Sequence, residues 1–257
     1  MSKPNIVMIG AGNVASHLAP AISEAGAGNI VQVYSRTMDS ARSLAGKLPE
    51  AMPTDSLRDI RRDADIYILS VKDDAIPQIV NALPKTSALC LHTSGSVGME
   101  ALAPLSDNFG VFYPLQTFSK NVSLDMKSVP LFVEGSTPEV EAQIREFGER
   151  VFKSVYHADS EIRKKMHISA VFACNFTNHL WTVAENLLAR EGLPFDVLRP
   201  LLEETLRKAF VNSPSASQTG PAVRGDRNIV DAHLSMLDGT EKELYRILSE
   251  SIMGKQG

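Results

Sequence analysis

Short apolar runs alternate with helix-like segments from residue 5 to about residue 158, and this alternation constrains the fold more than any other feature of the chain. The apolar runs are rich in β-branched residues and occupy 5–9, 30–35, 65–71, 88–93, 110–113, 130–135 and 154–158. Segments with helical spacing lie between them, at 13–26, 38–48, 75–83, around 99–105 and at about 138–152. Strands that are apolar throughout and alternate with amphipathic helices are typical of a parallel sheet covered on both faces, with right-handed crossovers. The sequence therefore predicts a doubly wound α/β domain.

The first turn from strand to helix has the sequence IGAGNVA, which places Gly10, Gly12 and Ala15 in a G-x-G-x-x-A pattern. Gly10 allows a tight turn, Gly12 lets a phosphate approach bare backbone, and Ala15 lets the helix pack closely on the strand. Asn13 and Val14 open the helix, whose free N–H groups and positive end stabilise an anion. The pattern therefore predicts a Rossmann-type dinucleotide site, with a purely structural glycine turn as the alternative.

The end of the second apolar run indicates which dinucleotide binds. A site for NAD usually carries an acidic residue there for the ribose 2′-hydroxyl, whereas this chain has Ser35, Arg36 and Thr37. A guanidinium binds a 2′-phosphate through paired hydrogen bonds, and the two hydroxyls can assist it. NADP(H) is therefore the predicted cofactor. The alternative is that Arg36 is an ordinary solvated loop residue.

Two further strand ends are expected to face the same crevice, because ligands in open α/β sheets lie at the carboxyl edge. The third run is followed by Val71, Lys72 and Asp73, and the fourth leads into Thr93 and Ser94. These five residues are predicted to contact the nicotinamide half of the cofactor.

Helix capping is the competing interpretation for the polar residues at these two strand ends. Asp73 or Asp74 could cap the next helix, and Ser94 or Ser96 the one after it. Capping is the favoured interpretation for Asp74, while both interpretations stay open for His92 and Ser94.

Composition describes an ordinary soluble chain and excludes several classes of protein. The 257 residues are 44% hydrophobic and 22% charged, with a net charge of −4, so no basic surface for nucleic acid is expected. No apolar run approaches membrane-spanning length, and the short N-terminal run is too short for a signal peptide. Cys90 and Cys174 lack the spacing of metal ligands, so no metal site is expected and both are interpreted as buried thiols in a reducing compartment. A cytoplasmic location follows.

Strand patterns end near residue 158, which predicts a dinucleotide-binding domain over 1–158 and a helical domain over 159–257. Helices are expected at 160–190, 195–211 and 240–253, the last opening with a capping box of Thr240 and Glu243. A helical domain joined to a nucleotide-binding domain usually completes the substrate cleft.

The first of these helices is strongly apolar yet carries three polar residues of interest. At about 100° per residue, Asn175 and Asn178 fall within about 80° of His167 on the helix surface. Buried polar groups need partners, and a ligand pocket provides them. His167, Asn175 and Asn178 are therefore predicted to line a pocket, with a structural hydrogen-bond network as the alternative.

A loop with the sequence QTGPAVRGD carries Arg224 two residues before Asp226. Arg224 could bind an anionic group of the substrate while Asp226 orients it. An internal ion pair or a helix cap is the equally open alternative.

Five segments together resemble a known family: GAGNVA, LHTSGS, FYPLQTFS, NFTNHL and TGPAVRGD, in this order and over nearly the whole chain. The chain is similar to an uncharacterised family of Rossmann-like NADP-dependent oxidoreductases with a helical C-terminal domain of unknown function. More distant similarity extends to pyrroline-5-carboxylate reductase, ketopantoate reductase, the 6-phosphogluconate and 3-hydroxyacid dehydrogenases, and deazaflavin-dependent NADP reductase. The resemblance implies NADP(H) binding and a homodimer formed through the helices. It does not bring the Lys–Asn pair of the hydroxyacid dehydrogenases, because Lys164 is followed four residues later by Ile168.

The combined prediction is an NADPH-dependent reductase acting on a C=O or C=N group of a small anionic metabolite. The cofactor supplies the hydride, and His167 is predicted to donate the proton. Asn175 and Asn178 would orient the substrate, and Arg224 would bind its anionic group. A non-catalytic NADP(H)-binding sensor is the rival hypothesis.

Overall fold

The computed structural model describes residues 3–254, which form two compact units, Met1–Cys174 and Asn175–Gly257. The sequence places the boundary near residue 158, and the observed division falls inside the long helical segment that follows.

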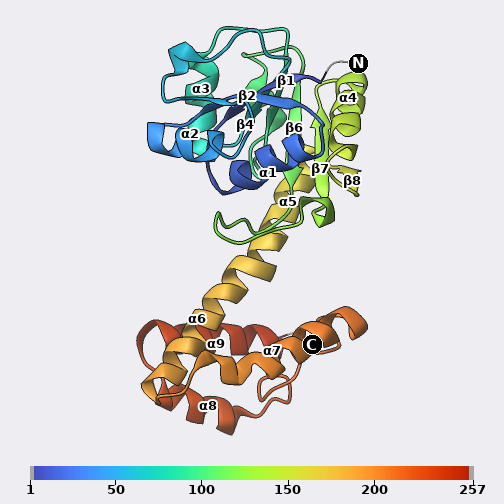
Figure 1. Cartoon of the computed structure of the whole chain (residues 1–257). Helices are drawn as coiled ribbons and strands as arrows, with labels where there is room; N and C mark the ends of the chain where they lie inside the picture. The colour runs from blue at the N-terminus through green and yellow to red at the C-terminus, as the bar shows by residue number, and fades with distance from the viewer. Residues whose placement is uncertain (1–2, 255–257) are drawn as a thin grey trace. The chain divides into compact units, whose positions relative to one another are not determined.

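The first unit is built on one eight-stranded sheet with the order β3-β2-β1-β4-β5-β6-β7-β8 (Figure 1). The strands are β1 Asn5–Ile9, β2 Asn29–Tyr34, β3 Met52–Thr54, β4 Ile66–Leu69, β5 Leu89–His92, β6 Phe109–Pro114, β7 Leu131–Gly135 and β8 Val155–His157. All neighbours are parallel except β6 and β7, which are antiparallel. The doubly wound Rossmann-type sheet is thus confirmed.

Apolar residues on both faces of the sheet explain why its central strands are buried. Helices α1 Asn13–Glu24, α2 Met38–Ala45 and α4 Pro138–Glu149 contribute to one core cluster, which also includes Ile6 and Ile68. Helix α3 Ile76–Ala82 and the 3₁₀ turn η3 Met99–Leu102 contribute to the other, with Val7 and Leu69. Adjacent residues of one strand face opposite cores, as the two-residue period of a strand requires.

The all-parallel expectation is wrong at β7. The segment between β6 and β7 contains only the 3₁₀ turn η4 Met126–Ser128 and no crossover helix, so the chain re-enters the sheet from the edge at which it left. The Leu115 N–H donates to the Pro130 carbonyl oxygen at 3.0 Å, which closes this connection. Strand β3 was not predicted, because three residues that include a proline carry no clear pattern.

The long helical segment that follows β8 is one predicted helix in three parts. It comprises α5 Ser160–Ala170, a π-helical turn η5 Val171–Phe176, and α6 Thr177–Arg190. A π-helical turn takes more residues than an α-helical turn, so a constant angle per residue does not hold across it. The value of about 100° per residue, which predicts that His167 and Asn178 lie on the same side of the helix, therefore does not hold across this turn.

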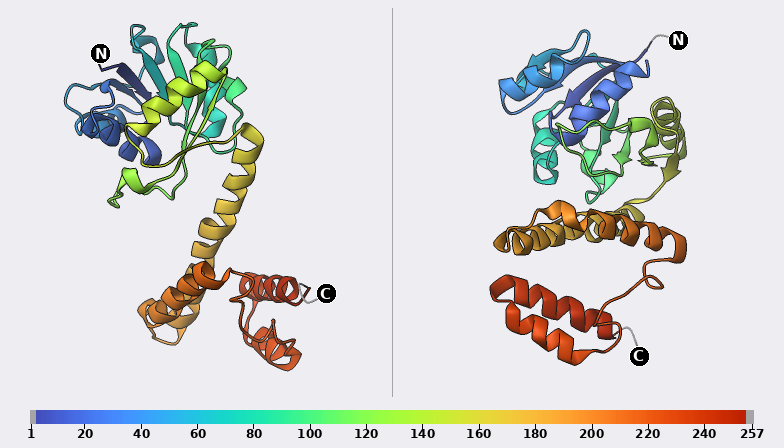
Figure 2. Two further views of the ribbon diagram at one scale, coloured as in Figure 1. Left: turned by 90° about the vertical axis from the view of Figure 1, so that its right-hand side faces the viewer. Right: turned by 60° about the horizontal axis from the view of Figure 1, so that its bottom comes forward.

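The second unit continues with the 3₁₀ turn η6 Phe195–Leu198 and helices α7 Arg199–Asn212, α8 Arg227–Met236 and α9 Gly239–Met253. Helices α8 and α9 run side by side (Figure 2). Asp238 occupies the N-cap of α9 without a capping side-chain bond, and Glu243 pairs with Arg246, so the predicted capping box is absent.

Candidate active site

The carboxyl ends of five neighbouring strands lie at one level of the sheet. Ile9 of β1 pairs with Tyr34 of β2 and Leu69 of β4, Leu69 pairs with His92 of β5, and His92 pairs with Val111 of β6. The residues that follow these five therefore meet along a single edge, where ligands of open α/β sheets bind. Most of the predicted cofactor residues stand at this edge.

The glycine turn after β1 has the geometry that the motif requires. Gly10 has a φ of 117°, and a Cβ built there would lie 2.1 Å from the Ser70 carbonyl oxygen, so only glycine fits. Gly12 has no atom within 4 Å of such a Cβ, so the space in front of its backbone is open. Gly12 is also the N-cap of α1 and contributes no capping side chain, which leaves the first N–H groups of the helix, around Asn13 and Val14, able to bind an anion.

The residues after β2 are accessible, as a cofactor contact requires. Ser35 is half-buried, while Arg36 and Thr37 are exposed. Thr37 Oγ1 donates to Ser40 Oγ at 2.9 Å. Across residues 3–254, no carboxylate lies within ion-pair distance of the Arg36 guanidinium.

The loops after β4 and β5 are tied together by polar side chains. Ser96 Oγ donates to Asp73, and Ser94 Oγ accepts from the N–H groups of Ser96 and Val97 at 3.1 and 3.0 Å. Thr93 Oγ1 donates to Ser70 Oγ at 3.3 Å. Ser94 thus stabilises its own loop, while Asp73 joins that loop to the other.

Asp74 does not cap a helix, contrary to the prediction. The short 3₁₀ turn η2 Asp73–Ala75 precedes α3, and neither element receives a capping bond from a side chain. Val71 is half-buried and Lys72 is exposed beside this turn.

His92 is a buried structural residue with one defined tautomer. Its Nδ1 accepts from the Ser94 N–H at 3.2 Å, so Nε2 carries the proton and donates to the Gly98 carbonyl oxygen at 3.3 Å. Burial, together with the nearby Arg163 charge, lowers the pKa of His92 to about 4. The imidazole is therefore neutral near pH 7 and orders the loop after β5.

Helix α5 is fixed to the sheet by a buried ion pair. Arg163 is fully buried, and its Nη1 donates to Glu134 Oε2 of β7 at 2.6 Å. Glu134 also accepts from the Ser160 N–H at 3.0 Å and from Ser160 Oγ at 2.8 Å, at the first turn of α5. Arg163 Nη2 donates to the Val97 carbonyl oxygen at 2.5 Å. One guanidinium thus connects α5, β7 and the loop after β5.

This attachment brings His167 to a tyrosine at the end of β6. His167 Nδ1 lies 3.0 Å from the Tyr113 hydroxyl, and the two rings meet edge to face. A Cβ built on Gly95 would lie 2.7 Å from His167 Nδ1 and 2.8 Å from Tyr113 Cζ, so the loop backbone packs directly against the pair. Burial raises the pKa of Tyr113. Tyr113 and His167 thus form a pair that can hold and transfer a proton, with Gly95 packed against both rings.

Tyr113 was not identified from the sequence, although a signal for it existed. It stands at the end of an apolar run, in GVFYPLQTFS, just as Thr93 and Ser94 follow theirs. The same argument about strand ends would have identified it. Because a tyrosine within an apolar run is usually a core residue, the sequence did not indicate Tyr113 as a site residue.

Asn175, Asn178 and Arg224 belong to the second unit and are all exposed. Asp226 is the N-cap of α8 and accepts from the Ile229 N–H at 3.5 Å, which supports the capping alternative for this residue. Arg224 has no ion-pair partner in the described part of the chain. Their roles stay predictions.

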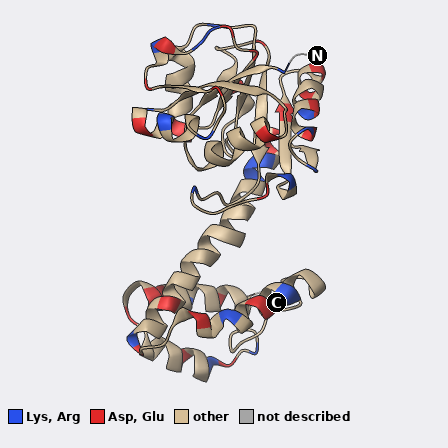
Figure 3. Ribbon diagram, viewed as in Figure 1, with Lys and Arg blue, Asp and Glu red and all other residues tan. Residues whose placement is uncertain are grey.

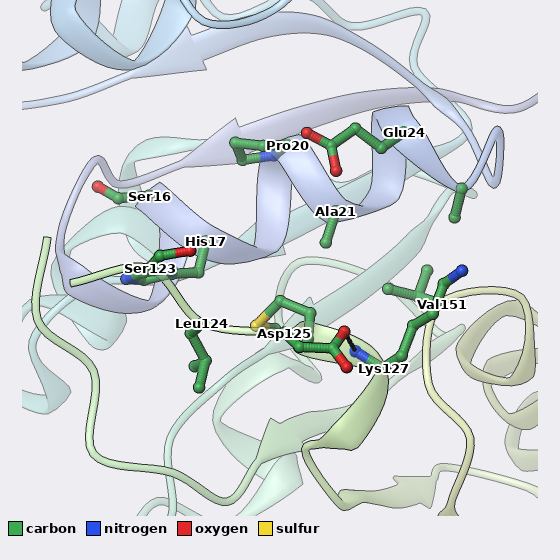
Figure 4. A pocket seen from close by; sticks show the side chains of 12 residues that line it. Ser16, His17, Pro20, Ala21, Glu24, Ser123, Leu124, Asp125, Lys127 and Val151 are labelled. Atoms are coloured by element: carbon green, nitrogen blue, oxygen red, sulfur yellow. Dashed lines mark hydrogen bonds between the residues drawn. The ribbon is translucent and has the colours of Figure 1, made fainter. Parts of the chain in front are cut away.

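A cavity of about 410 Å³ lies along α1 (Figure 4). Side chains of α1 such as His17 and Glu24 face Leu124 and Lys127 across it. None of the predicted site residues lines this cavity.

Residues 3–254 contain neither a metal site nor a membrane-spanning helix. No group of histidine, cysteine and acidic residues is arranged to hold a metal ion, and no helix is long and apolar enough to cross a membrane. Both cysteines are free, Cys90 buried and Cys174 exposed, so the expectation of two buried thiols is wrong for Cys174.

Comparison with known proteins identifies the class. Residues 5–90 match the family described as NADP oxidoreductase coenzyme F420-dependent, and residues 129–252 match a domain of unknown function, DUF2520. A crystal structure from Bacteroides fragilis, titled a "putative NADP oxidoreductase", is 44% identical with a TM-score of 0.93, covering 98% of this chain and 99% of that chain. The chain belongs to the same family of Rossmann-type NADP oxidoreductases and is an oxidoreductase.

More distant structures share the fold. An imine reductase from Myxococcus stipitatus in complex with NADP⁺ is 15% identical with a TM-score of 0.64, covering 98% of this chain and 92% of that chain. Pyrroline-5-carboxylate reductase from Coxiella burnetii is 17% identical with a TM-score of 0.57, covering 99% and 93%. The search of curated proteins returned no match.

The buried neutral state of His92 predicts a pH dependence of stability. Its pKa is lowered from 6.5 to about 4, so between these values the unfolded chain takes up a proton that the folded chain does not. The free energy of unfolding is therefore expected to fall by up to about 3 kcal/mol as the pH drops through this window. Denaturant unfolding between pH 7 and pH 4 should show a flatter profile for His92→Asn, whose amide oxygen can still accept from Ser94. Equal slopes for both proteins would contradict the assignment.

Proposed function

We propose that the protein is an NADPH-dependent reductase that transfers hydride to a C=O or C=N group of a small anionic metabolite. The observation that supports this most strongly is the presence, at one edge of one sheet, of an open glycine turn and a hydrogen-bonded tyrosine–histidine pair. The first suits a dinucleotide phosphate and the second suits proton transfer. The names of the similar structures, an NADP oxidoreductase and an imine reductase with NADP⁺, agree with this proposal.

The residues at this edge fit the cofactor. Gly10, Gly12, Asn13 and Val14 would hold the pyrophosphate, and Ser35, Arg36 and Thr37 would hold the 2′-phosphate. The nicotinamide half would lie against Val71, Lys72, Asp73, Thr93 and Ser94. When bound, NADPH supplies the hydride from C4 of its nicotinamide ring.

The chain itself must then supply a proton and a place for the substrate. His167 is half-buried and its Nδ1 lies 3.0 Å from the Tyr113 hydroxyl, and an imidazole in such a place suits the role of proton source. We assign substrate orientation to Asn175 and Asn178, and binding of the anionic group to Arg224. The helical domain, predicted as 159–257, would complete the substrate cleft, and a cytoplasmic location would give access to the NADPH pool.

Turnover of a substrate panel tests the reductase proposal. We expect NADPH oxidation, followed by absorbance, with at least one member of a panel of keto acids, aldehydes and cyclic imines. His167→Ala should lower kcat by about 10²-fold or more with unchanged NADPH affinity, because it removes the proton source. His157→Ala, at an exposed histidine of β8, is the matched control and should keep full activity. Tight NADPH binding without turnover of any compound would instead favour the sensor.

Cofactor choice tests the role of Arg36. Arg36→Ala should weaken NADPH binding by about 10- to 100-fold, because a charge-assisted bidentate contact is lost, and leave NADH binding unchanged. Titration of the protein with each cofactor, followed by fluorescence, gives both affinities. Equal affinity of the wild type for NADH and NADPH would refute the 2′-phosphate assignment.

The second unit lacks a core of its own, which supports the homodimer. Within residues 175–254, the buried apolar side chains are Ala222 and Val230. Large apolar residues on its helices are exposed instead, including Trp181 at 41%, Leu206 at 62% and Phe210 at 86%. So little burial does not stabilise a unit of this size. A second copy of the chain is the covering partner that we propose, because one patch on each copy closes a symmetric pair.

The mass in solution tests the dimer. Wild-type protein should sediment as a dimer, and Leu206→Asp/Phe210→Asp should sediment as a monomer, because each carboxylate would be desolvated in the interface. Lys208→Asp, on the same helix but at a charged position, is the matched control and should stay dimeric. A monomeric wild type at micromolar concentration would refute this assembly.

A further inference from the structure

The hydrogen bond between Tyr113 and His167 raises the question of which atom reaches the substrate. We propose that the Tyr113 hydroxyl is the group that hands the proton to the substrate, and that His167 is a positioning residue that returns a proton to it. This inference rests on the proposed reductase function and refines it, since His167 stays the proton source but acts through the phenol.

The position of Tyr113 in the sheet supports its contact with substrate. Val111 is level with His92 and Leu69, so Tyr113 stands two residues beyond the common level, as Val71 and Ser94 do on β4 and β5. Strand β6 is the second neighbour of β4, and adjacent strands lie about 5 Å apart, so Tyr113 is about 10 Å across the edge from β4. The cofactor is expected at the switch in strand order between β1 and β4. Tyr113 therefore borders the space next to the nicotinamide, where a substrate must lie.

The surroundings keep the two side chains together. Gly95 packs against both rings, and its loop is joined to Asp73 through Ser96. On the other side, Arg163 fixes α5, which carries His167. The loop and the helix hold the phenol and the imidazole side by side, so the 3.0 Å contact is preorganised.

The charges around the phenol suit an acid that is regenerated. Burial raises the pKa of Tyr113, so the hydroxyl keeps its proton at neutral pH. The neighbouring charged groups are Arg163 of α5, which lowers this pKa, and Asp73 of η2, which raises it. Glu134 of β7 is paired with Arg163, and His92 of β5 is neutral near pH 7. A phenolate formed at this position is thus poorly solvated and takes a proton from the adjacent imidazolium.

The step balances in atoms and electrons. Hydride leaves nicotinamide C4 and forms a C–H bond with the substrate carbon, while the π electrons of C=O or C=N move to the heteroatom. The heteroatom takes the phenol proton, and the phenolate oxygen takes the proton from His167 Nδ1. The imidazole then recovers a proton from water. NADPH is oxidised by two electrons, the substrate is reduced by two, and one proton is consumed.

Four variants test the relay on the best substrate of the panel. Tyr113→Phe should lower kcat by about 10²-fold or more, as much as His167→Ala, and the double variant should be no slower than either, because the two residues act as one unit. NADPH affinity should be unchanged in all three. Tyr156→Phe, at an exposed tyrosine of β8, is the matched control and should be fully active.

Rescue by free imidazole separates the two possible donors. Added imidazole should raise the rate of His167→Ala several-fold, since it can return a proton to Tyr113, and should not raise the rate of the double variant. The relay is overturned if Tyr113→Phe keeps kcat within about threefold of wild type, or if imidazole rescues the double variant. If the wild type reduces no compound, the reductase proposal itself fails, which is a distinct outcome.

Discussion

The buried ion pair between Arg163 and Glu134 is the interaction on which the arrangement of this site depends. Its two side chains are 0% and 9% exposed, and one guanidinium joins α5, β7 and the loop after β5. Such pairs add little net stability, but removing one partner costs about 3–5 kcal/mol because the other charge is left buried. The pair therefore fixes the position of α5 on the sheet. Arg163 Nε has no hydrogen-bond partner among the residues described, so the buried guanidinium is not completely paired.

The position that this ion pair gives to α5 determines which residues meet at the ligand edge of the sheet. Glu134 of β7 is level with Val111 of β6, and Tyr113 lies two residues further along, about 7 Å towards the edge. On α5, His167 lies four residues beyond Arg163, which is about 6 Å along the helix axis. The helix and the strand thus advance by nearly the same distance from a common anchor. The 3.0 Å contact between Tyr113 and His167 follows from this match.

The sequence predicted the sheet and the cofactor edge because both depend on local patterns. Apolar runs identify strands, and Gly10 belongs to a short glycine pattern whose turn has a φ of 117°. The antiparallel β7 and the π-helical turn at Val171–Phe176 were not predictable in this way, because each depends on where the chain goes next. Tyr113 and Arg163 act through contacts with residues 54 and 29 positions away, which no short pattern reveals. Cys174 was misassigned because an apolar neighbourhood in sequence need not be a buried one in space.

The middle of the long helical segment shows the same difference between sequence and burial. No lysine, arginine, aspartate or glutamate occurs from 166 to 184, and the ribbon carries no charge colour there (Figure 3). Ile168 and Trp181 within it are 57% and 41% exposed. An uncharged helix surface that is exposed to water agrees with the dimer that we propose. The sequence shows the apolar run but not whether one chain or two bury it.

The reversal of β7 has a consequence for how the long helical segment is joined to the sheet. In a sheet with every strand parallel, a helix leaving the last strand would start at the ligand edge and travel away from it. Because β7 and β8 run the opposite way, α5 starts beside Glu134, level with the carboxyl ends of the central strands, and continues beyond them to Tyr113. The elements β7, α4 and β8 thus connect the parallel part of the sheet to α5 and determine where α5 begins. We expect that a different helical domain fused to this sheet would keep the chemistry of the site only if β7 and β8 were transferred with it.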